Sequence, residues 1–284
     1  MKKYSVLMSL YIKEKPAYLT LALDSMLAQT VAPDEIVLVK DGPLTDELEA
    51  ILSDYAARYP ALFNIVPSEV NIGLGRALNL GLEHCRNELV ARMDTDDIAK
   101  PDRCEKQLRA FEENPELSLY GSAVDEFHTT PDEVVSCRVV PTEHKDIYHF
   151  AKRRSAFNHP TVMYKRSAVL GVGGYGDLRR NQDVDLFGRM LFSGCIAGNS
   201  AESLLFFRSN NDLAKRRRSW ENTKSYIGTI KKFRKMGYAS FADYAIVAIA
   251  QTGMFLMPVK LQHWVYKKFL RKSREDTARI KEPV

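Results

Sequence analysis

Three carboxylates stand within four residues of one another in the segment ELVARMDTDDIAKPDR (88–103): Asp94, Asp96 and Asp97. Carboxylates this close repel one another unless a positive charge lies between them, and a divalent cation with oxygen ligands is the usual solution. The alternative is a solvated acidic turn in which Asp94 or Asp97 caps the following helix. Because the cluster follows an apolar, strand-like run, the sequence favours a metal site.

The elements that would position this cluster follow from the hydrophobic pattern. Strand-like and helix-like segments alternate at short intervals in the first half of the chain, which predicts βαβ units and a mostly parallel sheet flanked by helices. The expected strands are 4–10, 34–42, 62–67 and 88–94, and the expected helices are 16–29, 44–59 and 72–85. The cluster therefore follows the fourth strand, at the sheet edge where ligands bind in open α/β folds.

The second half of the chain has a mixed pattern. Helices are expected at 101–114 and 182–194, and strands near 117–127, 133–140 and 160–164. After residue 214 the chain becomes basic, aromatic and helical in character. The pattern predicts an α/β domain with a C-terminal helical appendage.

The composition is that of a soluble globular protein. The chain has 284 residues, of which 45% are hydrophobic and 27% charged, and this excludes disordered and collagen-like classes. Its cysteines are far apart and form no CxxC pair, so neither a zinc site nor a disulfide framework is indicated. They are Cys85, Cys104, Cys137 and Cys195. A reducing cytoplasmic setting fits best, and the first apolar run, interrupted by Lys13, Glu14 and Lys15, is interpreted as a strand rather than a signal peptide.

Charge is divided unevenly along the chain. Residues 215–284 contain 17 Lys and Arg against 5 Asp and Glu, whereas residues 1–214 contain 24 basic and 31 acidic residues. An anionic membrane surface or a nucleic acid would attract such a tail. The apolar content of the tail exceeds what a phosphate-binding surface needs, so no nucleic-acid partner is expected.

The tail itself allows two interpretations. Its longest apolar run, AIVAIAQTGMFLMPV (245–259), has 15 residues, short of the roughly 20 needed to span a bilayer. Trp264, Tyr266 and Phe269 stand among lysines and arginines, which suits an anchor in the interface of an anionic membrane. The alternative is a helical subdomain that packs on the catalytic core.

Several segments together resemble the family 2 glycosyltransferases, which have the GT-A fold. They are SVLMSLYIKEKPAYLTLALDSMLAQT, EIVLVKDG, NIGLGRALNLGL, VARMDTDD and FNHPTVMYKRS, in family order between about residues 4 and 210. The branch that builds bacterial capsule, exopolysaccharide and lipopolysaccharide is the most similar, partly because of FFRSNNDLAKRR. The resemblance implies a catalytic domain at 1–214, with a Rossmann-like nucleotide-sugar half at 1–100 and an acceptor half at 101–214, followed by a helical tail at 215–284.

The resemblance implies donor-binding roles for residues of the first half. Asp41 matches the acidic residue that recognises the nucleotide base, although an Asp-Gly turn is its structural alternative. Ser9, Leu10 and Tyr11 follow the first strand, where family members hold base and ribose. Gly75, Arg76 and Asn79 match the helix start beside the nucleotide, where glycine lets the backbone approach and the helix N-terminus favours anions. Arg76 is equally well explained as a surface ion-pair residue.

Asp94 and Asp96 match the family's DxD motif, with Asp97 beside them and Arg92 and Thr95 within the same donor-binding segment. By resemblance this motif binds the ribose and a Mg²⁺ or Mn²⁺ that bridges the donor diphosphate. Such a cation neutralises charge on the departing nucleoside diphosphate. The roles of the three carboxylates are not separable from the sequence.

Asp183 matches the family's base, which opens a helix below the acceptor. Family members often have a Glu-Asp pair here, but this chain has Gln182 and Asp183, so the aspartate is the candidate to take the proton of the acceptor hydroxyl. Asp185 is its competitor. His159 is expected among the ligand-binding residues on the acceptor side, with a structural role at a strand entry as the alternative.

Arg208 and Arg217 follow the last core strand, where the family has a mobile loop. Some relatives complete the metal shell there with a histidine, but this chain has Ser209, Asn210 and Asn211. The two arginines are expected to clamp the diphosphate, and a solvated basic stretch is the alternative.

These residues predict a metal-dependent, inverting glycosyltransferase. Its donor would be a nucleoside diphosphate sugar, with UDP favoured and galactose a first trial, and its acceptor a glycan or lipid-linked glycan in bacterial surface polysaccharide synthesis. It would lie in the cytoplasm, peripherally at the inner face of the cytoplasmic membrane. The alternatives are a sugar-phosphate nucleotidyltransferase, which would carry a Gly-rich loop where this chain has SLYIKEKPAY, and a noncatalytic nucleotide-sugar-binding relative.

Overall fold

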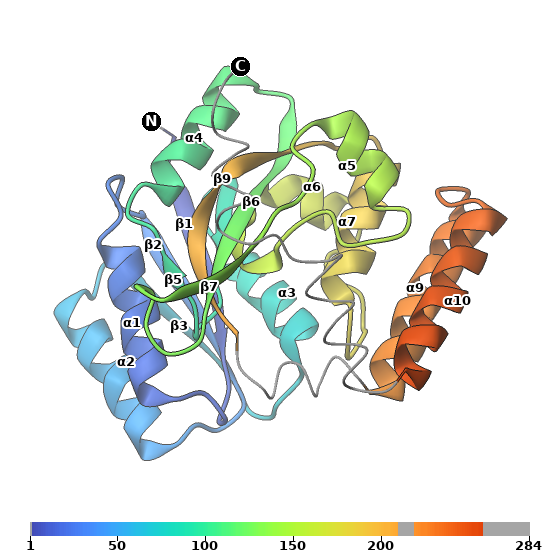
Figure 1. The fold of residues 1–284 in the computed structure, drawn as a ribbon. Coiled ribbons are helices and arrows are strands. Elements are labelled where there is room, and N and C mark those ends of the chain that lie inside the picture. The colour runs from blue at the N-terminus through green and yellow to red at the C-terminus, as the bar shows by residue number, and fades with distance from the viewer. Residues whose placement is uncertain (1, 210–218, 258–284) are drawn as a thin grey trace.

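A mixed sheet of nine strands organises the part of the chain that the computed structural model describes, residues 2–209 and 219–257. The strand order is β3-β2-β1-β4-β8-β6-β9-β5, and β7 pairs with β6 outside this path. Helices lie on both faces of the sheet, and a helical hairpin stands at one side of the molecule (Figure 1). The predicted α/β fold with a mostly parallel sheet and C-terminal helices is confirmed.

The first four strands run parallel to one another. They are β1 (Tyr4–Leu10), β2 (Glu35–Asp41), β3 (Phe63–Ser68) and β4 (Leu89–Arg92), connected by α1 (Pro16–Leu27), α2 (Asp46–Arg58) and α3 (Leu74–His84). Each bound lies within two residues of the sequence prediction. Because successive side chains point to opposite faces of a strand, Leu7 and Val39 pack with α3, whereas Val6 and Leu38 pack with α1 and α2.

The remaining core elements alternate less regularly. They are β5 (Ile98–Ala99), α4 (Arg103–Glu113), β6 (Leu117–Phe127), β7 (Val134–Arg138), α5 (His144–Phe150), a 3₁₀ turn (His159–Thr161), β8 (Met163–Lys165), α6 (Arg166–Gly171), α7 (Gln182–Phe192) and β9 (Ile196–Arg208). The helices α4 and α7 and the strands β6, β7 and β8 were predicted, but α5 and α6 were not. The 7-residue α5 buries one side chain, Ile147, so it leaves almost no periodic signal in the sequence.

The long strand β9 connects distant parts of the site. It runs parallel to β6, from the pair Leu117 and Ile196 to the pair Phe127 and Arg208. It also pairs antiparallel with β5, Ile98 opposite Phe206. Because β5 directly follows the acidic cluster, this pairing brings the end of β9 next to the three carboxylates.

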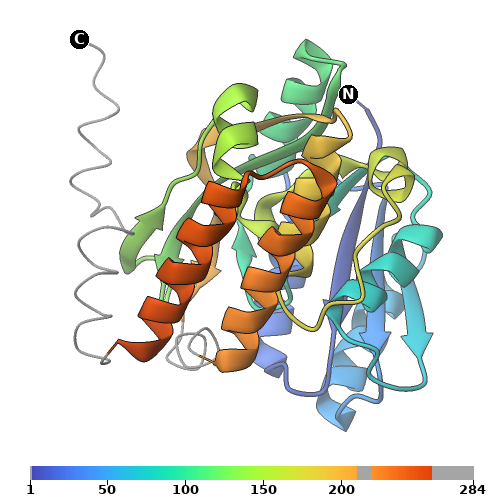
Figure 2. The same cartoon turned by 90° about the vertical axis from the view of Figure 1, so that its right-hand side faces the viewer.

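The C-terminal helices α9 (Trp220–Met236) and α10 (Phe241–Leu256) form a hairpin (Figure 2). The α9 side chains Ile230 and Phe233 are fully buried in the same hydrophobic cluster as Phe187 and Met190 of α7. The packed helical arrangement that was one of the two interpretations of the tail is therefore present at α9.

The aromatic residues from Trp264 onward lie outside the described residues. No helix within 2–209 and 219–257 is long and apolar enough to cross a bilayer.

The contact between Gly188 and Phe233 makes the docking of α9 on α7 testable. A methyl carbon at position 188 would overlap the ring of Phe233. We expect Gly188→Ala to destabilise the protein by about 1–3 kcal/mol, as substitutions that overpack a core do. Thermal unfolding measures this. Gly228→Ala is the matched control, because nothing lies within 4 Å of that position in α9, and it should be neutral or slightly stabilising. Equal effects of the two substitutions would contradict the packing described.

Candidate active site

The three carboxylates lie together in the loop after β4. Their ligand oxygens lie within 4.8 Å of one another. Asp97 is buried, its Oδ1 accepts a hydrogen bond from Arg208 N at 2.8 Å, and no described residue donates to its Oδ2. A buried carboxylate oxygen without a donor fits a cation ligand, so these residues could hold a metal ion.

Without a cation, burial and mutual repulsion destabilise the ionised form of this cluster. Burial raises the pKa of Asp96 to about 7, and the charges of Asp94 and Glu14 act in the same direction. Burial raises the pKa of Asp97 as well, followed by the charges of Asp96 and Asp94. The site therefore retains a proton near neutral pH unless another positive charge replaces it.

Glu14 belongs to this cluster, although the sequence pattern did not indicate it. Thr95 Oγ1 donates to Glu14 Oε2 at 2.6 Å, and Lys15 N donates to the other carboxylate oxygen at 2.8 Å. Glu14 lies in the loop after β1, and β1 pairs in parallel with β4, so the loops that follow the two strands are neighbours. One signal in the sequence could have identified Glu14. It is a carboxylate that closely follows β1, and β1 pairs with β4, the strand that leads into the three carboxylates.

Arg92, the last residue of β4, lies next to the cluster and is 1% exposed. One end of its guanidinium forms an ion pair with Asp94, while no described residue accepts a hydrogen bond from its Nε or Nη1. Its positive charge also lowers the pKa of Asp183 and His159; burial is the larger influence on both groups. Arg92 is therefore within electrostatic reach of both the acidic cluster and the predicted base.

Asp183 lies in the first turn of α7 and is half-buried. Burial raises its pKa, and the charge of Asp94 is a smaller influence in the same direction. Asn181, just before the helix, has a left-handed backbone with φ 59°, a conformation that asparagine tolerates better than most residues. The turn thus presents Asp183 at the start of a helix.

Asp185, the competitor of Asp183, is differently placed. It is fully buried and forms ion pairs with Arg189 at 2.8 Å and with Lys232 of α9. Arg189 also donates to the carbonyls of Val172 and Gly174. Through these bonds Asp185 holds α7, the preceding loop and α9 together. Asp183 is therefore the carboxylate that is left as a candidate base.

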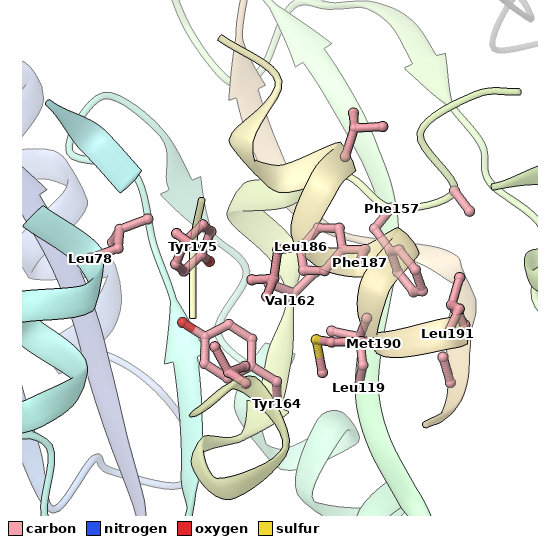
Figure 3. Close-up of a cluster of buried hydrophobic side chains, with 14 of the residues drawn as sticks. Leu78, Leu119, Phe157, Val162, Tyr164, Tyr175, Leu186, Phe187, Met190 and Leu191 are labelled. Carbon is pink, nitrogen blue, oxygen red and sulfur yellow. The ribbon is translucent and has the colours of Figure 1, made fainter. Parts of the chain in front are cut away.

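His159 lies against Tyr175 in the core between β8 and α7. Its Nε2 is 2.9 Å from Tyr175 Oη, and burial lowers its pKa well below the usual value, so it is neutral. Tyr175 lies close to Tyr164, with Leu186 and Phe187 of α7 beside them (Figure 3). Asn79 of α3 donates to Tyr175 O at 2.8 Å and accepts from Tyr175 N at 2.7 Å. Both predicted residues thus contact Tyr175, and their predicted ligand contacts stay predictions.

Asp41 holds the loop that opens α3. Its carboxylate accepts hydrogen bonds from Ile72 N at 2.6 Å, from Gly73 N at 3.2 Å and from the Asn71 side chain at 3.1 Å. Burial raises its pKa. Its predicted contact with the nucleotide base stays a prediction, to which the structure adds a role in shaping the loop.

A cavity of about 360 Å³ lies between this loop and residues 176–179. Gly75 and Arg76 line it, and Arg76 forms an ion pair with Asp177 on the other side.

At the end of the first strand, Ser9 is half-buried and Leu10 is buried, and Tyr11, which follows the strand, is exposed. Tyr11 is therefore accessible to a ligand, as a lid on the base would have to be.

Arg208 supports the acidic loop. It is buried, its guanidinium lies 3.8 Å from the ring centroid of Tyr18 and 4.5 Å from that of Phe127, and its Nε donates to Asp96 O at 2.9 Å. These contacts fix the loop rather than leave the guanidinium free, and the predicted diphosphate clamp stays a prediction. Arg217, Asn210 and Asn211 lie outside the described residues.

Comparison with known proteins agrees with this fold. The model of the family described as "Glycosyl transferase family 2" matches residues 5–171. Amylovoran biosynthesis glycosyltransferase AmsE of Erwinia amylovora is 38% identical over 93% of this chain and 98% of its own length. An Escherichia coli protein named UDP-Gal:alpha-D-GlcNAc-diphosphoundecaprenol beta-1,3-galactosyltransferase is 36% identical over 95% of this chain and 97% of its own length.

A solved structure shares the fold at low sequence identity. The mannosyltransferase PcManGT from Pyrobaculum calidifontis, in complex with GDP-Man and Mn2+, superposes with a TM-score of 0.62 at 15% identity, covering 94% of this chain and 79% of that one. The fold is thus the GT-A fold. The chain belongs to glycosyl transferase family 2, and it is an inverting glycosyltransferase.

The raised pKa of Asp96 predicts opposite effects of one substitution on stability and on metal response. When the pKa of a carboxyl is higher in the folded protein than in the unfolded chain, the folded protein loses stability as the pH rises from the lower to the higher of these two values. For Asp96 the higher value, that of the folded protein, is about 7. At pH 8 without metal, Asp96→Asn should therefore melt higher than the wild type, by about 3 °C. Added Mn²⁺ should stabilise the wild type and leave the variant unchanged. Asp54→Asn on the surface of α2 is the control, and a full Mn²⁺ response in Asp96→Asn would contradict the metal assignment.

The hydrogen bond between Glu14 and Thr95 predicts a coupled loss of metal-dependent binding. Because both residues position the same loop, Glu14→Ala and Thr95→Val should each weaken UDP binding in Mn²⁺ by about tenfold, and the double variant should lose little more. Titration calorimetry with and without Mn²⁺ measures this, with exposed Lys13→Gln as the control from the same loop. Additive losses in the double variant would show that the two side chains act separately.

Proposed function

We propose that this glycosyltransferase uses Mn²⁺ or Mg²⁺ and transfers a hexose from a UDP-sugar, with UDP-galactose as the first candidate, to a glycan or lipid-linked glycan in bacterial surface polysaccharide synthesis. The observation that carries the proposal is the cluster of Asp94, Asp96 and Asp97, whose ligand oxygens lie within 4.8 Å of one another and in which the buried Asp97 Oδ2 has no donor among the described residues. The 36% identical E. coli relative, whose printed name includes UDP-Gal and a diphosphoundecaprenol acceptor, supports the choice of donor and acceptor.

The proposed reaction is a single displacement. Asp183 takes the proton of an acceptor hydroxyl as its oxygen forms a bond with the anomeric carbon, and the bond between that carbon and the donor diphosphate breaks on the opposite face. The raised pKa of Asp183 makes it a stronger base than an ordinary aspartate. Held by Asp94, Asp96 and Asp97, a divalent cation would neutralise the charge that develops on the leaving diphosphate.

Residues of the first half complete the proposed donor pocket. Asp41 and the loop that it holds would lie at the base, with Ser9, Leu10 and Tyr11 beside base and ribose. Gly75 and Arg76 would face the donor across the cavity that ends at Asp177. A lipid-linked acceptor would require the enzyme to work peripherally at the inner face of the cytoplasmic membrane, which is part of the same proposal.

Asp183→Asn tests the assignment of the base. An amide cannot take the acceptor proton, so transfer should fall by about 10²–10⁴-fold while UDP binding in Mn²⁺ stays within about twofold of the wild type. The assay follows radiolabelled galactose from UDP-galactose into a GlcNAc-diphospholipid acceptor. Asp185→Asn is the matched comparison, and it should lower the melting temperature because it breaks two ion pairs. Normal turnover by Asp183→Asn would overturn the assignment.

A second measurement keeps the choice of donor separate from the choice of base. Thermal shifts of the wild type with UDP-, GDP-, dTDP- and CMP-sugars, each with and without Mn²⁺, should show the largest metal-dependent stabilisation with a UDP-sugar. A larger shift with another nucleotide would replace UDP in the proposal and leave the role of Asp183 intact.

A further inference from the structure

The outward face of α10 is apolar along its whole length. Its exposed residues are Phe241, Ala242, Ile246, Ile249, Ala250, Gly253 and Leu256, none of which is polar. Phe241 is 64% exposed, Ile249 75% and Leu256 73%. A surface helix normally turns its charged side to water, and a contiguous apolar surface of this kind marks a contact with a partner or a membrane.

The polar and apolar sides of α10 are the reverse of those of an ordinary surface helix. Its one charged residue, Asp243, is buried on the inner side, where it caps the helix through Ser240 and pairs with Arg153. The interior contact of α10 is thus partly polar and its exterior is apolar. Packing on the core does not account for the outward isoleucines.

One end of this face lies on the same side of the molecule as the start of α7. The rings of Trp220, at the start of α9, and Phe255, near the end of α10, lie 5.2 Å apart, so the two helices run antiparallel. Ser225 of α9 donates to Arg180 O at 2.9 Å, and the loop that contains Arg180 leads directly to Asp183. The Leu256 end of α10 therefore lies on the same side of the molecule as the predicted base.

Basic residues accompany the apolar face. Lys224, Lys231, Arg234 and Lys235 are exposed on the neighbouring α9. The sequence beyond α10, residues 258–284, contains eight Lys and Arg against three Asp and Glu. A second copy of the chain, or the chain's own basic end, would bring like charges against α9, whereas an anionic surface would be attracted to it.

We propose that the outward face of α10 lies in the interfacial layer of an anionic phospholipid membrane. Phe241, Ile246, Ile249 and Leu256 enter the boundary between headgroups and acyl chains, and the lysines and arginines of α9 meet the headgroups. This orientation holds the Leu256 end of α10, the end toward the loop that leads to Asp183, at the membrane surface. The inference deepens the proposed function, on which it rests for the lipid-linked acceptor.

Vesicle binding tests the surface without donor, acceptor or metal. The full chain is sedimented with vesicles of phosphatidylglycerol and phosphatidylethanolamine, and with neutral phosphatidylcholine vesicles. The wild type should bind the anionic vesicles at least about tenfold more tightly, and the double substitution Ile246→Asp with Ile249→Asp should reduce that binding by at least about tenfold. Leu21→Asp is the matched control, because Leu21 is 45% exposed on the distant helix α1, and it should bind as the wild type does.

A second, milder variant and two further measurements make the outcome decisive. Ile246→Ser with Ile249→Ser should show the same loss in smaller degree, and melting temperatures confirm that the variants fold. Unchanged vesicle binding in both double variants would overturn the proposal. So would a concentration-dependent dimer in ultracentrifugation that the substitutions abolish, because a second copy would then cover the face.

The activity of the same variants separates this inference from the proposed reaction. Transfer to a short, water-soluble acceptor should be unchanged in the double variants, while transfer to an acceptor embedded in anionic vesicles should fall by at least about fivefold. Absence of transfer to every acceptor by the wild type would count against the proposed donor and acceptor, and the vesicle-binding result would still stand.

Discussion

Mutual repulsion among three carboxylates is the constraint on which the rest of the site depends. Their oxygens lie within 4.8 Å of one another at the end of β4, partly out of water, where like charges interact strongly. The chain surrounds them with positive charge and donors: Arg92 pairs with Asp94, and the backbone N–H of Arg208 donates to Asp97. These contacts shape the loop, and within the described residues they leave the buried Asp97 Oδ2 without a donor, a position that a cation would fill. Strands β4, β5 and β9 are positioned by the sheet so that this arrangement can form.

The position of α7, which carries the proposed base Asp183, depends in turn on the C-terminal hairpin. Asp183 is useful only if α7 is held in place, and α7 is held by Asp185, Arg189 and Lys232 and by the ring of Phe233 against Gly188. One of these ion-pair partners and the ring come from α9. The hairpin is therefore part of the structure that positions the proposed base, and the same hairpin carries the apolar outer face of α10. The proposed membrane contact and the catalytic geometry thus share one element.

Particular residues show how far the sequence alone reaches. The first four strands, the helices between them and α7 were predictable because their hydrophobic periods are long and regular. The helix α5 was not, because seven residues with one fully buried side chain carry no period. Glu14 was missed because its partner, Thr95, is 81 residues away and meets it only through the parallel pairing of β1 and β4. The bonds of Arg208 to Asp96 and of Asp41 to Ile72 and Gly73 were not predictable, because they depend on loops whose shape no local pattern describes.

The sequence by itself determined the fold class, the strand that leads into the three carboxylates and the helix whose first turn contains Asp183. These follow from local periodicity and from residue types that repel or attract charge over a few positions. Only the tertiary structure decided that Asp185 rather than Asp183 forms ion pairs with Arg189 of α7 and Lys232 of α9. It also decided that the charge of Arg92 acts on both Asp183 and the acidic cluster, and that the apolar side of α10 faces outward. Each of these depends on contacts between segments far apart in the chain, and burial, which raises the pKa of Asp96 and Asp183, is a property of the packed molecule.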